Sequence, residues 1–390
     1  MSIRADSLAR LAVLTGCNLS PSQPLIVEGP VEAMPLIEAI ARAAEAAGAA
    51  NIERVIDNPD ELRQRLLSGD VAPDSAQVEQ MLKVAEKLAA GAARIRVLAP
   101  RPDLLEGIAA ARILQAHKAW GEANERAAAV LAGKSPADTA VPFPTAAWAG
   151  RVFPSISPQE AVTHLWDGLA VALQLDADDT AAAWAAHFSR LETRKAKLET
   201  MSLQTLHIQG PDTAMTLTLA EPNIWSGGRL RADNGRLFAP QLPLASLSVA
   251  IHPAGTGGRM RITRPIILAG ELVSELSIEV SDGTVCAVNA EARNGALGSL
   301  LSLAPEARRV QRVALVDRST PAARMGLNFL NPLLDACATS MISLGGSPHG
   351  NAEGTALHID ACFGEDILQI SGTDSQGRLH RLIADGLFLV

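Results

Sequence analysis

Tyrosine is absent from all 390 residues of this chain, and aromatic residues of any kind make up only 3%. A phenolic hydroxyl is therefore excluded from every catalytic scheme. Cysteine is also scarce, and the four cysteines lie far apart without a CxxC motif: Cys17, Cys286, Cys337 and Cys362. This spacing predicts neither a disulfide framework nor a thiolate zinc site, so we expect small buried fillers in a reducing compartment.

Basic residues are fewer than acidic residues: the chain has 34 Lys and Arg and 42 Asp and Glu, which gives a net charge of −8. No polybasic run interrupts this balance, so we expect neither a nucleic-acid partner nor an anionic membrane surface. The sequence also lacks an apolar stretch that approaches the length of a membrane span. We therefore expect a cytoplasmic protein.

The length of the chain predicts two domains, residues 1–200 and 201–390. In the first, Ala-rich helical periodicity alternates with short β-like runs such as Leu25–Val27 and Ile95–Leu98. This alternation predicts an α/β domain with a mainly parallel sheet. The first run, followed by Gly-Pro and an apolar-periodic stretch over 31–46, predicts a strand, a turn and a helix.

Two further segments of the first half indicate helices. Ser157-Pro158-Gln159-Glu160 has the residues of a good helix start. A longer helical stretch, from about Thr180 to Met201, carries a run of basic side chains: Arg190, Arg194, Lys195 and Lys197. We expect this run to be a solvated helix face rather than a binding patch.

After residue 200 the pattern changes to short strands separated by Gly, Pro, Asn and Asp, as in Met215–Leu219 and Leu276–Val280. This pattern predicts a β-rich α+β domain with a few helices. The Gly-rich segment Gly255–Gly258 is expected to be a turn between two strands.

His358 and Asp360 are the most informative pair in this second domain. The segment Thr355–Phe363 alternates and is rich in β-formers, so it predicts a strand on which positions two apart share one face. An imidazole and a carboxylate would then project together. These are ligand types preferred by zinc, manganese and ferrous iron, so the pair suggests half of a metal site.

Six segments spread over nearly the whole chain form recognisable motifs: Pro144–Ala149, Val152–Pro154, Leu165–Asp167, Leu206–Thr213, Phe329–Asp335 and His358–Asp360. In this order and at similar spacing, they resemble the signatures of the thermophilic metalloaminopeptidases, the aminopeptidase T and aminopeptidase S family. The resemblance implies the fold of that family and the removal of N-terminal amino acids from peptides. It also implies a homodimer.

The resemblance further implies two adjacent divalent metals, held by two Glu, two His and one Asp, with a tyrosine nearby. Such a metal pair polarises the scissile carbonyl and generates the hydroxide nucleophile. His358 and Asp360 match the final two ligands of the family. The tyrosine position corresponds to Pro348.

The remaining three ligand positions depart from the family pattern. The family's Asn-x-Pro-Thr-Glu-Glu signature corresponds to Gln241–Ser246, which puts Ala245 or Ser246 in place of a ligand glutamate. By the same comparison, Arg312 stands for the second glutamate and Met341 for the first histidine.

Ser246, Arg312 and Met341 together cannot hold a second hard divalent metal, and a fixed positive charge at Arg312 would repel one. We therefore infer that the dinuclear site is incomplete and that peptide hydrolysis is lost. A repurposed small-molecule enzyme is favoured, with His358 and Arg312 as its catalytic residues. At most one divalent metal, iron or zinc, is expected as cofactor.

An enzyme with a single metal is also consistent with these residues. A divergent branch of the family, the dihydroxypyridine ring-cleaving dioxygenases, uses the same His-x-Asp with one further histidine around ferrous iron. In this chain His358 and Asp360 would need His252 or His349 as the third ligand. Both of these histidines are also consistent with loop positions that have no ligand role.

Two further hypotheses need no metal. Arg312 could pair with Asp360 or hold the carboxylate of a ligand, with His358 as an acid or base. The chain could instead be a noncatalytic protein whose role is assembly. A small-molecule or short peptide-like ligand is the expected partner, and Asp335, which matches a family position near the site, is expected to support it.

Overall fold

The computed structural model describes residues 2–291, 295–346, 357–364 and 367–390. It contains two compact units, each assembled from segments that are far apart in the sequence. Unit 1 comprises Met1–Ile108, Gln115–Phe188 and Arg229–Leu244. Unit 2 comprises Ala109–Leu114, Ser189–Gly228 and Ala245–Val390.

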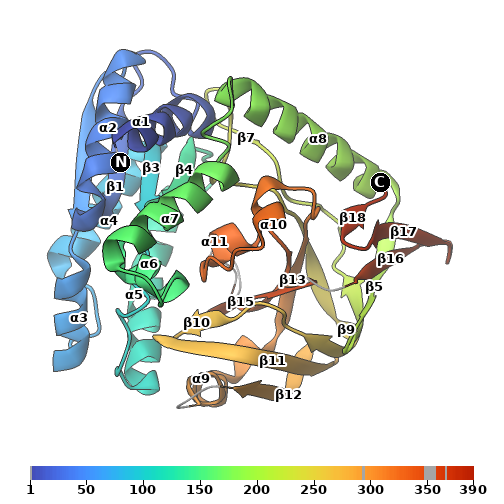
Figure 1. Ribbon diagram of the computed structural model, residues 1–390. Helices are drawn as coiled ribbons and strands as arrows, with labels where there is room; N and C mark the ends of the chain where they lie inside the picture. The colour runs from blue at the N-terminus through green and yellow to red at the C-terminus, as the bar shows by residue number, and fades with distance from the viewer. Residues whose placement is uncertain (1, 292–294, 347–356, 365–366) are drawn as a thin grey trace. The chain divides into compact units, whose positions relative to one another are not determined.

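Unit 1 is built on a four-stranded parallel sheet with the strand order β2-β1-β3-β4 (Figure 1). Its strands are β1 (Leu25–Pro30), β2 (Ile52–Asp57), β3 (Ala93–Leu98) and β4 (Asp138–Pro142). The connecting segments are helical, as expected for parallel strands, which need crossover connections. The predicted α/β domain with a mainly parallel sheet is confirmed.

The helices of this part of the chain are α1 (Ser2–Leu11), α2 (Met34–Ala46), α3 (Pro59–Ser68), α4 (Ser75–Ala89), α5 (Ala110–Val130), α6 (Ala146–Val152), α7 (Pro158–Ala172) and α8 (Thr180–Thr200). A short hairpin, β7 (Leu230–Arg231) with β8 (Leu237–Phe238), also belongs to unit 1. Ile37 of α2 lies beside Gly29 of β1, whereas Val84 and Leu88 of α4 pack against Ile26. Side chains alternate between the two faces along a strand, and Ile26 and Gly29 are three residues apart, so they face opposite sides. Helices α2 and α4 therefore cover opposite faces of the sheet.

Local sequence signals explain where several of these elements begin. The predicted strand, turn and helix after residue 25 are confirmed as β1 and α2. The predicted helix start at Ser157 is also confirmed, because its side chain accepts a hydrogen bond from the Glu160 amide while Glu160 bonds back to the Ser157 amide. This capping box satisfies backbone donors that the first helical turn leaves unpaired.

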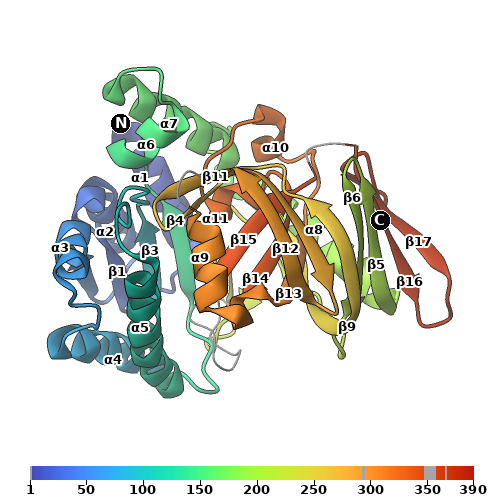
Figure 2. The same cartoon turned by 90° about the horizontal axis from the view of Figure 1, so that it is seen from below.

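Unit 2 contains a twelve-stranded sheet whose main path is β15-β14-β13-β9-β6-β5-β16-β17-β18 (Figure 2). The strands of this path are β5 (Leu203–Gly210), β6 (Thr213–Leu219), β9 (Leu247–Arg261), β13 (Val310–Leu315), β14 (Ser340–Gly345), β15 (His358–Phe363), β16 (Gln369–Asp374), β17 (Leu379–Ala384) and β18 (Leu387–Phe388). Every pairing along the path is antiparallel. The predicted β-rich α+β character is confirmed.

The remaining strands branch from β9, and short helices connect the strands of unit 2. These elements are β10 (Ile266–Leu268), β11 (Glu271–Ser281), β12 (Thr284–Glu291), α9 (Ala296–Leu303), α10 (Pro321–Met325) and α11 (Pro332–Asp335). The predicted strands at Met215–Leu219 and Leu276–Val280 lie within β6 and β11. The predicted strand at His358 is β15.

The prediction of a turn between strands at Gly255–Gly258 is wrong, because these residues lie inside β9. Thr218 of β6 pairs with His252, whereas Thr216 pairs with Gly257, so β9 carries extra residues at this point. The Thr256 hydroxyl closes the bulge by accepting from the Thr218 amide and donating to the His252 carbonyl. Glycines permit such a bulge where the backbone approaches its neighbour closely.

The cysteines follow the prediction with one exception. Cys17, Cys337 and Cys362 are buried, but Cys286 is exposed on β12, where its alternating position faces solvent, so the prediction of a buried filler is wrong there. Burial raises the pKa of the Cys17 and Cys337 thiols to about 12, which makes both unreactive at neutral pH. Of the helices in the described ranges, none has both the length and the apolar character to cross a bilayer.

Candidate functional site

Four neighbouring strands at one end of the large sheet position the site residues. The register sets Asp360 of β15 opposite Ser343 of β14, and Ser343 in turn opposite Arg312 of β13. Ala250 of β9 completes this row. Directly paired residues of an antiparallel sheet project to the same face, so Asp360, Ser343 and Arg312 share one face.

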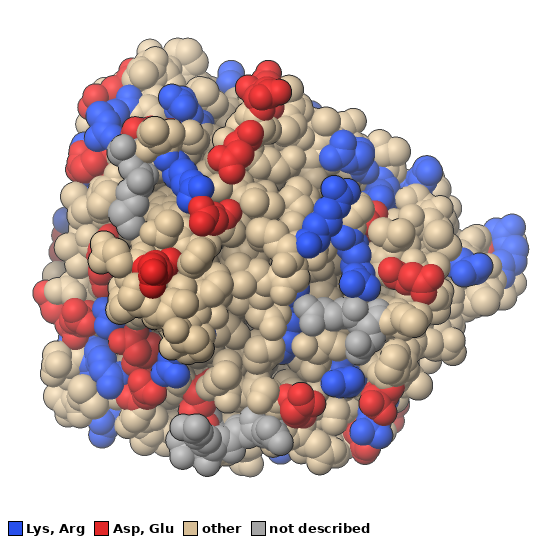
Figure 3. Space-filling model, in the orientation of Figure 1, with Lys and Arg blue, Asp and Glu red and all other residues tan. Residues whose placement is uncertain are grey.

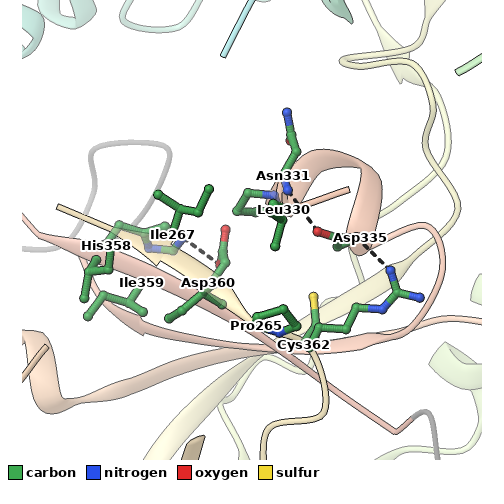
Figure 4. Close-up of a pocket in the computed structure, with 13 residues that line it drawn as sticks. Pro265, Ile267, Leu330, Asn331, Asp335, His358, Ile359, Asp360 and Cys362 are labelled. Carbon is green, nitrogen blue, oxygen red and sulfur yellow. Dashed lines mark hydrogen bonds and ion pairs between the residues drawn. The ribbon is translucent and has the colours of Figure 1, made fainter. Parts of the chain in front are cut away.

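His358 and Asp360 are joined by a direct hydrogen bond. The imidazole Nε2 lies 2.8 Å from Asp360 Oδ1 (Figure 4). The same carboxylate oxygen accepts a hydrogen bond from the Ser343 hydroxyl at 2.6 Å. On the other side of the ring, Nδ1 lies 2.5 Å from the carbonyl oxygen of Gly346. Both ring nitrogens of His358 are therefore engaged.

These partners hold the ring of His358 in place. The Gly346 carbonyl is only an acceptor, so the hydrogen bond to it is donated by His358 Nδ1. On the other side of the ring, Nε2 meets Asp360 Oδ1, which also accepts from the Ser343 hydroxyl. The geometry thus describes an imidazole and a carboxyl group that are hydrogen-bonded to each other and fixed by a third group.

The pKa of the Asp360 carboxyl lies below its ordinary value. Burial is the largest influence and raises this pKa, but it is outweighed by the hydrogen bond and charge of His358, the hydrogen bond from Ser343 and the positive charge of Arg312. Three separate groups therefore favour the ionised carboxylate. Asp360 remains negative at any pH near neutrality.

Arg312 acts on Asp360 through its charge rather than through a contact. Its Nε is buried without a hydrogen-bond partner. Over the ranges that the structure describes, no ion pair joins Arg312 to Asp360, whose Oδ1 is occupied by His358 and Ser343. The sequence allowed a bidentate ion pair between Arg312 and Asp360. In the structure, His358 is instead the side chain that bonds to the Asp360 carboxylate.

A cavity of about 90 Å³ lies along β15. Its lining residues come from the segment around β10, the turn before α11 and β15 itself: Arg264, Pro265, Ile266, Ile267, Leu268, Leu330, Asn331, Pro332, Asp335, His358, Ile359, Asp360 and Cys362. Figure 4 shows the Asp360 carboxylate pointing toward the turn that carries Leu330 and Asn331. All of these residues belong to unit 2. Asp335 thus lies beside His358 and Asp360, as the sequence suggested.

A second, fully buried ion pair fixes the wall of this cavity. Arg264 Nη1 donates to Asp335 Oδ1 at 2.7 Å and to the Leu327 carbonyl at 2.8 Å. The Phe329 and Asn331 amides donate to the two carboxylate oxygens of Asp335, each at 2.9 Å. Because these bonds tie the turn before α11 to Arg264, they hold the turn over β15 (Figure 4).

Met341, the residue in place of a family histidine, lies next to this site. It is 6% exposed, pairs with Cys362 of β15 and Ala314 of β13, and forms a small apolar cluster with these two residues and Ala336. It precedes Ser343 by two residues, so both side chains project to the same face. A thioether therefore lies on the same face of the sheet as Ser343 and Asp360.

The remaining predicted site residues lie elsewhere in the chain's second half. His252 is exposed on β9, pairs with Thr218 and does not line the cavity that holds His358 and Asp360. Ala245 is buried and Ser246 half-buried just before β9 begins. His349 and Pro348 fall outside the described residues.

His358 and Asp360 are thus the site residues of metal-ligand type that the structure brings together. Across residues 2–291, 295–346, 357–364 and 367–390, no group of three or more His, Cys, Asp or Glu side chains is placed to hold a metal ion. The neighbours of the pair in the sheet offer a hydroxyl, a guanidinium and a thioether.

Sequence reasoning missed Ser343 and Arg264. Ser343 had a usable signal, since it lies two residues beyond Met341 on a strand that pairs with the His-x-Asp strand. Arg264 had none, because its partner Asp335 is 71 residues away. Only the tertiary fold brings that pair together.

Comparisons with known proteins agree with the motifs. The chain matches the family described as thermophilic metalloprotease (M29) over residues 2–388. Aminopeptidase T of Thermus thermophilus is 31% identical over 400 residues, which span 99% of this chain and 98% of that protein. Aminopeptidase 2 of Geobacillus stearothermophilus is 29% identical over 401 residues, spanning 98% of this chain and 96% of that protein.

A solved structure extends the likeness to three dimensions. Wild-type AmpT from Thermus thermophilus matches this chain with a TM-score of 0.88 at 30% identity, and the match covers 99% of each chain. The predicted fold class, a parallel sheet with helices followed by a large antiparallel sheet, is therefore confirmed. The predicted family resemblance extends over nearly the entire sequence.

Proposed function

We propose that this chain, which belongs to the thermophilic metalloprotease (M29) family, acts on a small molecule at the His358–Asp360 site without a pair of metals. The observation that carries the proposal is the hydrogen-bonded set of His358, Asp360 and Ser343, with Arg312 in the same row of the sheet. The relatives are named as aminopeptidases, and on this proposal the chain keeps their fold but not their reaction.

The residues present do not fit a two-metal centre. Two adjacent divalent cations need several carboxylate or imidazole ligands between them. Beside Asp360 this chain has Ser343 and Arg312, and Met341 packs in the next position along β14. A dication bound at Asp360 Oδ1 would compete with two hydrogen bonds, and it would be repelled by the guanidinium of Arg312.

The side chains favour an anionic group on the ligand. The fixed positive charge of Arg312 lies in the same row of the sheet as Asp360, so it attracts a carboxylate brought to this site. Arg312 does not itself line the cavity, so this attraction acts over a distance. His358 lines the cavity beside Asp360, so it is the group best placed to exchange a proton with that ligand.

Elemental analysis combined with an aminopeptidase assay tests this proposal. We expect the purified protein to hold less than two equivalents of divalent metal and to release no nitroaniline from aminoacyl-nitroanilides with cobalt, zinc or manganese. Two equivalents of metal with a hydrolysis rate that disappears in His358→Ala would overturn the proposal. His252→Ala is a matched control, because it removes an exposed histidine that does not line the cavity.

A single-metal enzyme is the second candidate, and one distance favours it. His358 Nε2 and Asp360 Oδ1 lie 2.8 Å apart, close to the spacing of two neighbouring ligands of one zinc or iron ion, about 3 Å for metal–ligand bonds near 2.1 Å. One equivalent of iron or zinc, lost in both His358→Ala and Asp360→Ala, would favour this candidate over the metal-free site.

A further inference from the structure

The second half of α8 borders a surface cavity of about 220 Å³ in unit 2, which we call the α8 cavity. Its lining combines cations and hydroxyls: Ser189, Arg190, Thr193, Arg194, Lys197 and Val390. The sequence alone predicts only a solvated helix face for these cations. In the structure, Arg190, Arg194 and Lys197 all line this one cavity.

Helical spacing explains why the cations converge. Arg190, Arg194 and Lys197 lie four and three residues apart, which places them on one side of the helix. Ser189 and Thr193 follow the same spacing one position earlier. Figure 3 shows Lys and Arg side chains gathered right of the centre of this face, in the part of the view where Figure 1 draws α8.

Arg194 is held in place by contacts on several sides. Its Nη2 donates to Asp317 Oδ2 at 2.8 Å, and its Nε donates to the main-chain oxygen of Val390 at 3.4 Å. Its guanidinium carbon lies 4.4 Å from the centre of the Phe388 ring. The Arg194 charge is thus offset by Asp317, and its position gives the cavity a fixed wall.

Arg190 and Lys197 differ from Arg194, because neither forms an ion pair with any residue that the structure describes. Lys195, on the same helix, lies 3.9 Å from Glu199 and does not line the cavity. Arg190 and Lys197 therefore line the cavity without an ion pair to a described residue, in a chain whose net charge is −8.

We propose that the α8 cavity binds the phosphate group of a small ligand, with Arg190 and Lys197 as its charged partners and the Ser189 hydroxyl as a neutral donor. Two cations without ion pairs to described residues match a dianion better than a monocarboxylate, and a guanidinium suits the paired oxygens of phosphate. The cavity has the size of a small group, whereas a nucleic acid would need an extended basic stripe.

Titration calorimetry with inorganic phosphate at low ionic strength tests the proposal. We expect saturable binding to the full-length protein, weakened at least about tenfold in Arg190→Gln/Lys197→Gln, since a charge-assisted hydrogen bond contributes about 1.5–3 kcal/mol. Lys195→Gln is the matched control, because it removes one positive charge from the same helix outside the cavity. Thermal unfolding of each variant verifies that it is folded.

Several outcomes would overturn the proposal. These are the absence of saturable phosphate binding, equal weakening in Lys195→Gln and the double variant, or acetate binding as tight as phosphate. Sulfate distinguishes a general dianion site from one selective for phosphate, and equal affinity for both anions would overturn the assignment to phosphate. His358→Ala should leave phosphate binding unchanged, so the result does not depend on the reaction proposed for the His358–Asp360 site.

Discussion

Two ion pairs border the same cavity, and they differ in how completely their partners are satisfied. The Arg264 and Asp335 side chains are 3% and 6% exposed, and both carboxylate oxygens of Asp335 accept hydrogen bonds. The His358 and Asp360 side chains are 24% and 16% exposed, and Asp360 accepts from His358 and Ser343 through Oδ1. Within the described residues, both oxygens of Asp335 are thus engaged, whereas Asp360 accepts hydrogen bonds only through Oδ1.

This difference in burial and hydrogen bonding indicates that the Arg264–Asp335 pair supports the structure, whereas the His358–Asp360 pair is available for chemistry. A buried charge pair in which both carboxylate oxygens accept hydrogen bonds resists change, because removing either partner leaves an uncompensated charge in a poorly solvated place. In a partly exposed pair such as His358–Asp360, a ligand can replace one of the partners with a smaller loss of free energy. Arg264–Asp335 therefore sets the shape of the cavity, whereas His358–Asp360 supplies its chemistry.

Asp335→Asn should have the largest effect on stability. The substitution keeps the size of the side chain but leaves the Arg264 guanidinium without its counter-charge, and it replaces one acceptor oxygen by an amide donor. We expect a loss of about 3–5 kcal/mol in the free energy of unfolding, measured by urea denaturation.

The paired variant Arg264→Met/Asp335→Leu is the control for this effect. Removing both charges together should restore part of the loss, because no buried charge is left unpaired. If Asp335→Asn were less destabilising than Asp360→Asn, the distinction between a scaffold pair and an available pair would be wrong.

Much of the fold follows from local signals in the sequence. The capping box at Ser157, the β1-α2 unit and the alternation around β15 each depend on residues within a few positions of one another. The bulge of β9 shows the limit of such signals. Gly255–Gly258 has the composition of a turn, and its pairing with β6 and β11 keeps it within one strand.

The candidate site was predictable only in part, for the same reason. His358 and Asp360 are two residues apart, so strand periodicity alone joins them. Arg312 and Met341 were located through the family resemblance, since no local pattern brings three strands into register. The Arg264–Asp335 pair spans 71 residues and had no sequence signal.

Asp360→Asn should have an intermediate effect that depends on pH. The folded pKa of Asp360 lies below that of the unfolded chain, near 3.9, so ionised Asp360 stabilises the fold above that pH, and the contribution is lost as pH falls through the folded value. We expect Asp360→Asn to lose about 1–3 kcal/mol at pH 7, from urea denaturation.

The same measurement below pH 4 sharpens the comparison of the two pairs. The gap in unfolding free energy between the unmodified chain and Asp360→Asn should narrow as the pH falls. A gap that stays constant from pH 7 to pH 3 would mean that the Asp360 charge does not stabilise the fold. The His358–Asp360 pair would then stabilise the fold no more than an uncharged contact does.

Arg312→Met should have the smallest effect, and its sign is informative. The Arg312 Nε is buried without a hydrogen-bond partner, so this nitrogen bears a desolvation cost. An apolar side chain of similar length removes that cost and the long-range attraction to Asp360, and we expect a change within about 1 kcal/mol, measured by urea denaturation. A loss of unfolding free energy as large as that of Asp335→Asn would mean that Arg312, like Asp335, supports the structure of the cavity. An unchanged or increased stability, together with lost binding of carboxylate ligands in a thermal-shift screen, would instead mean that Arg312 is kept for a ligand.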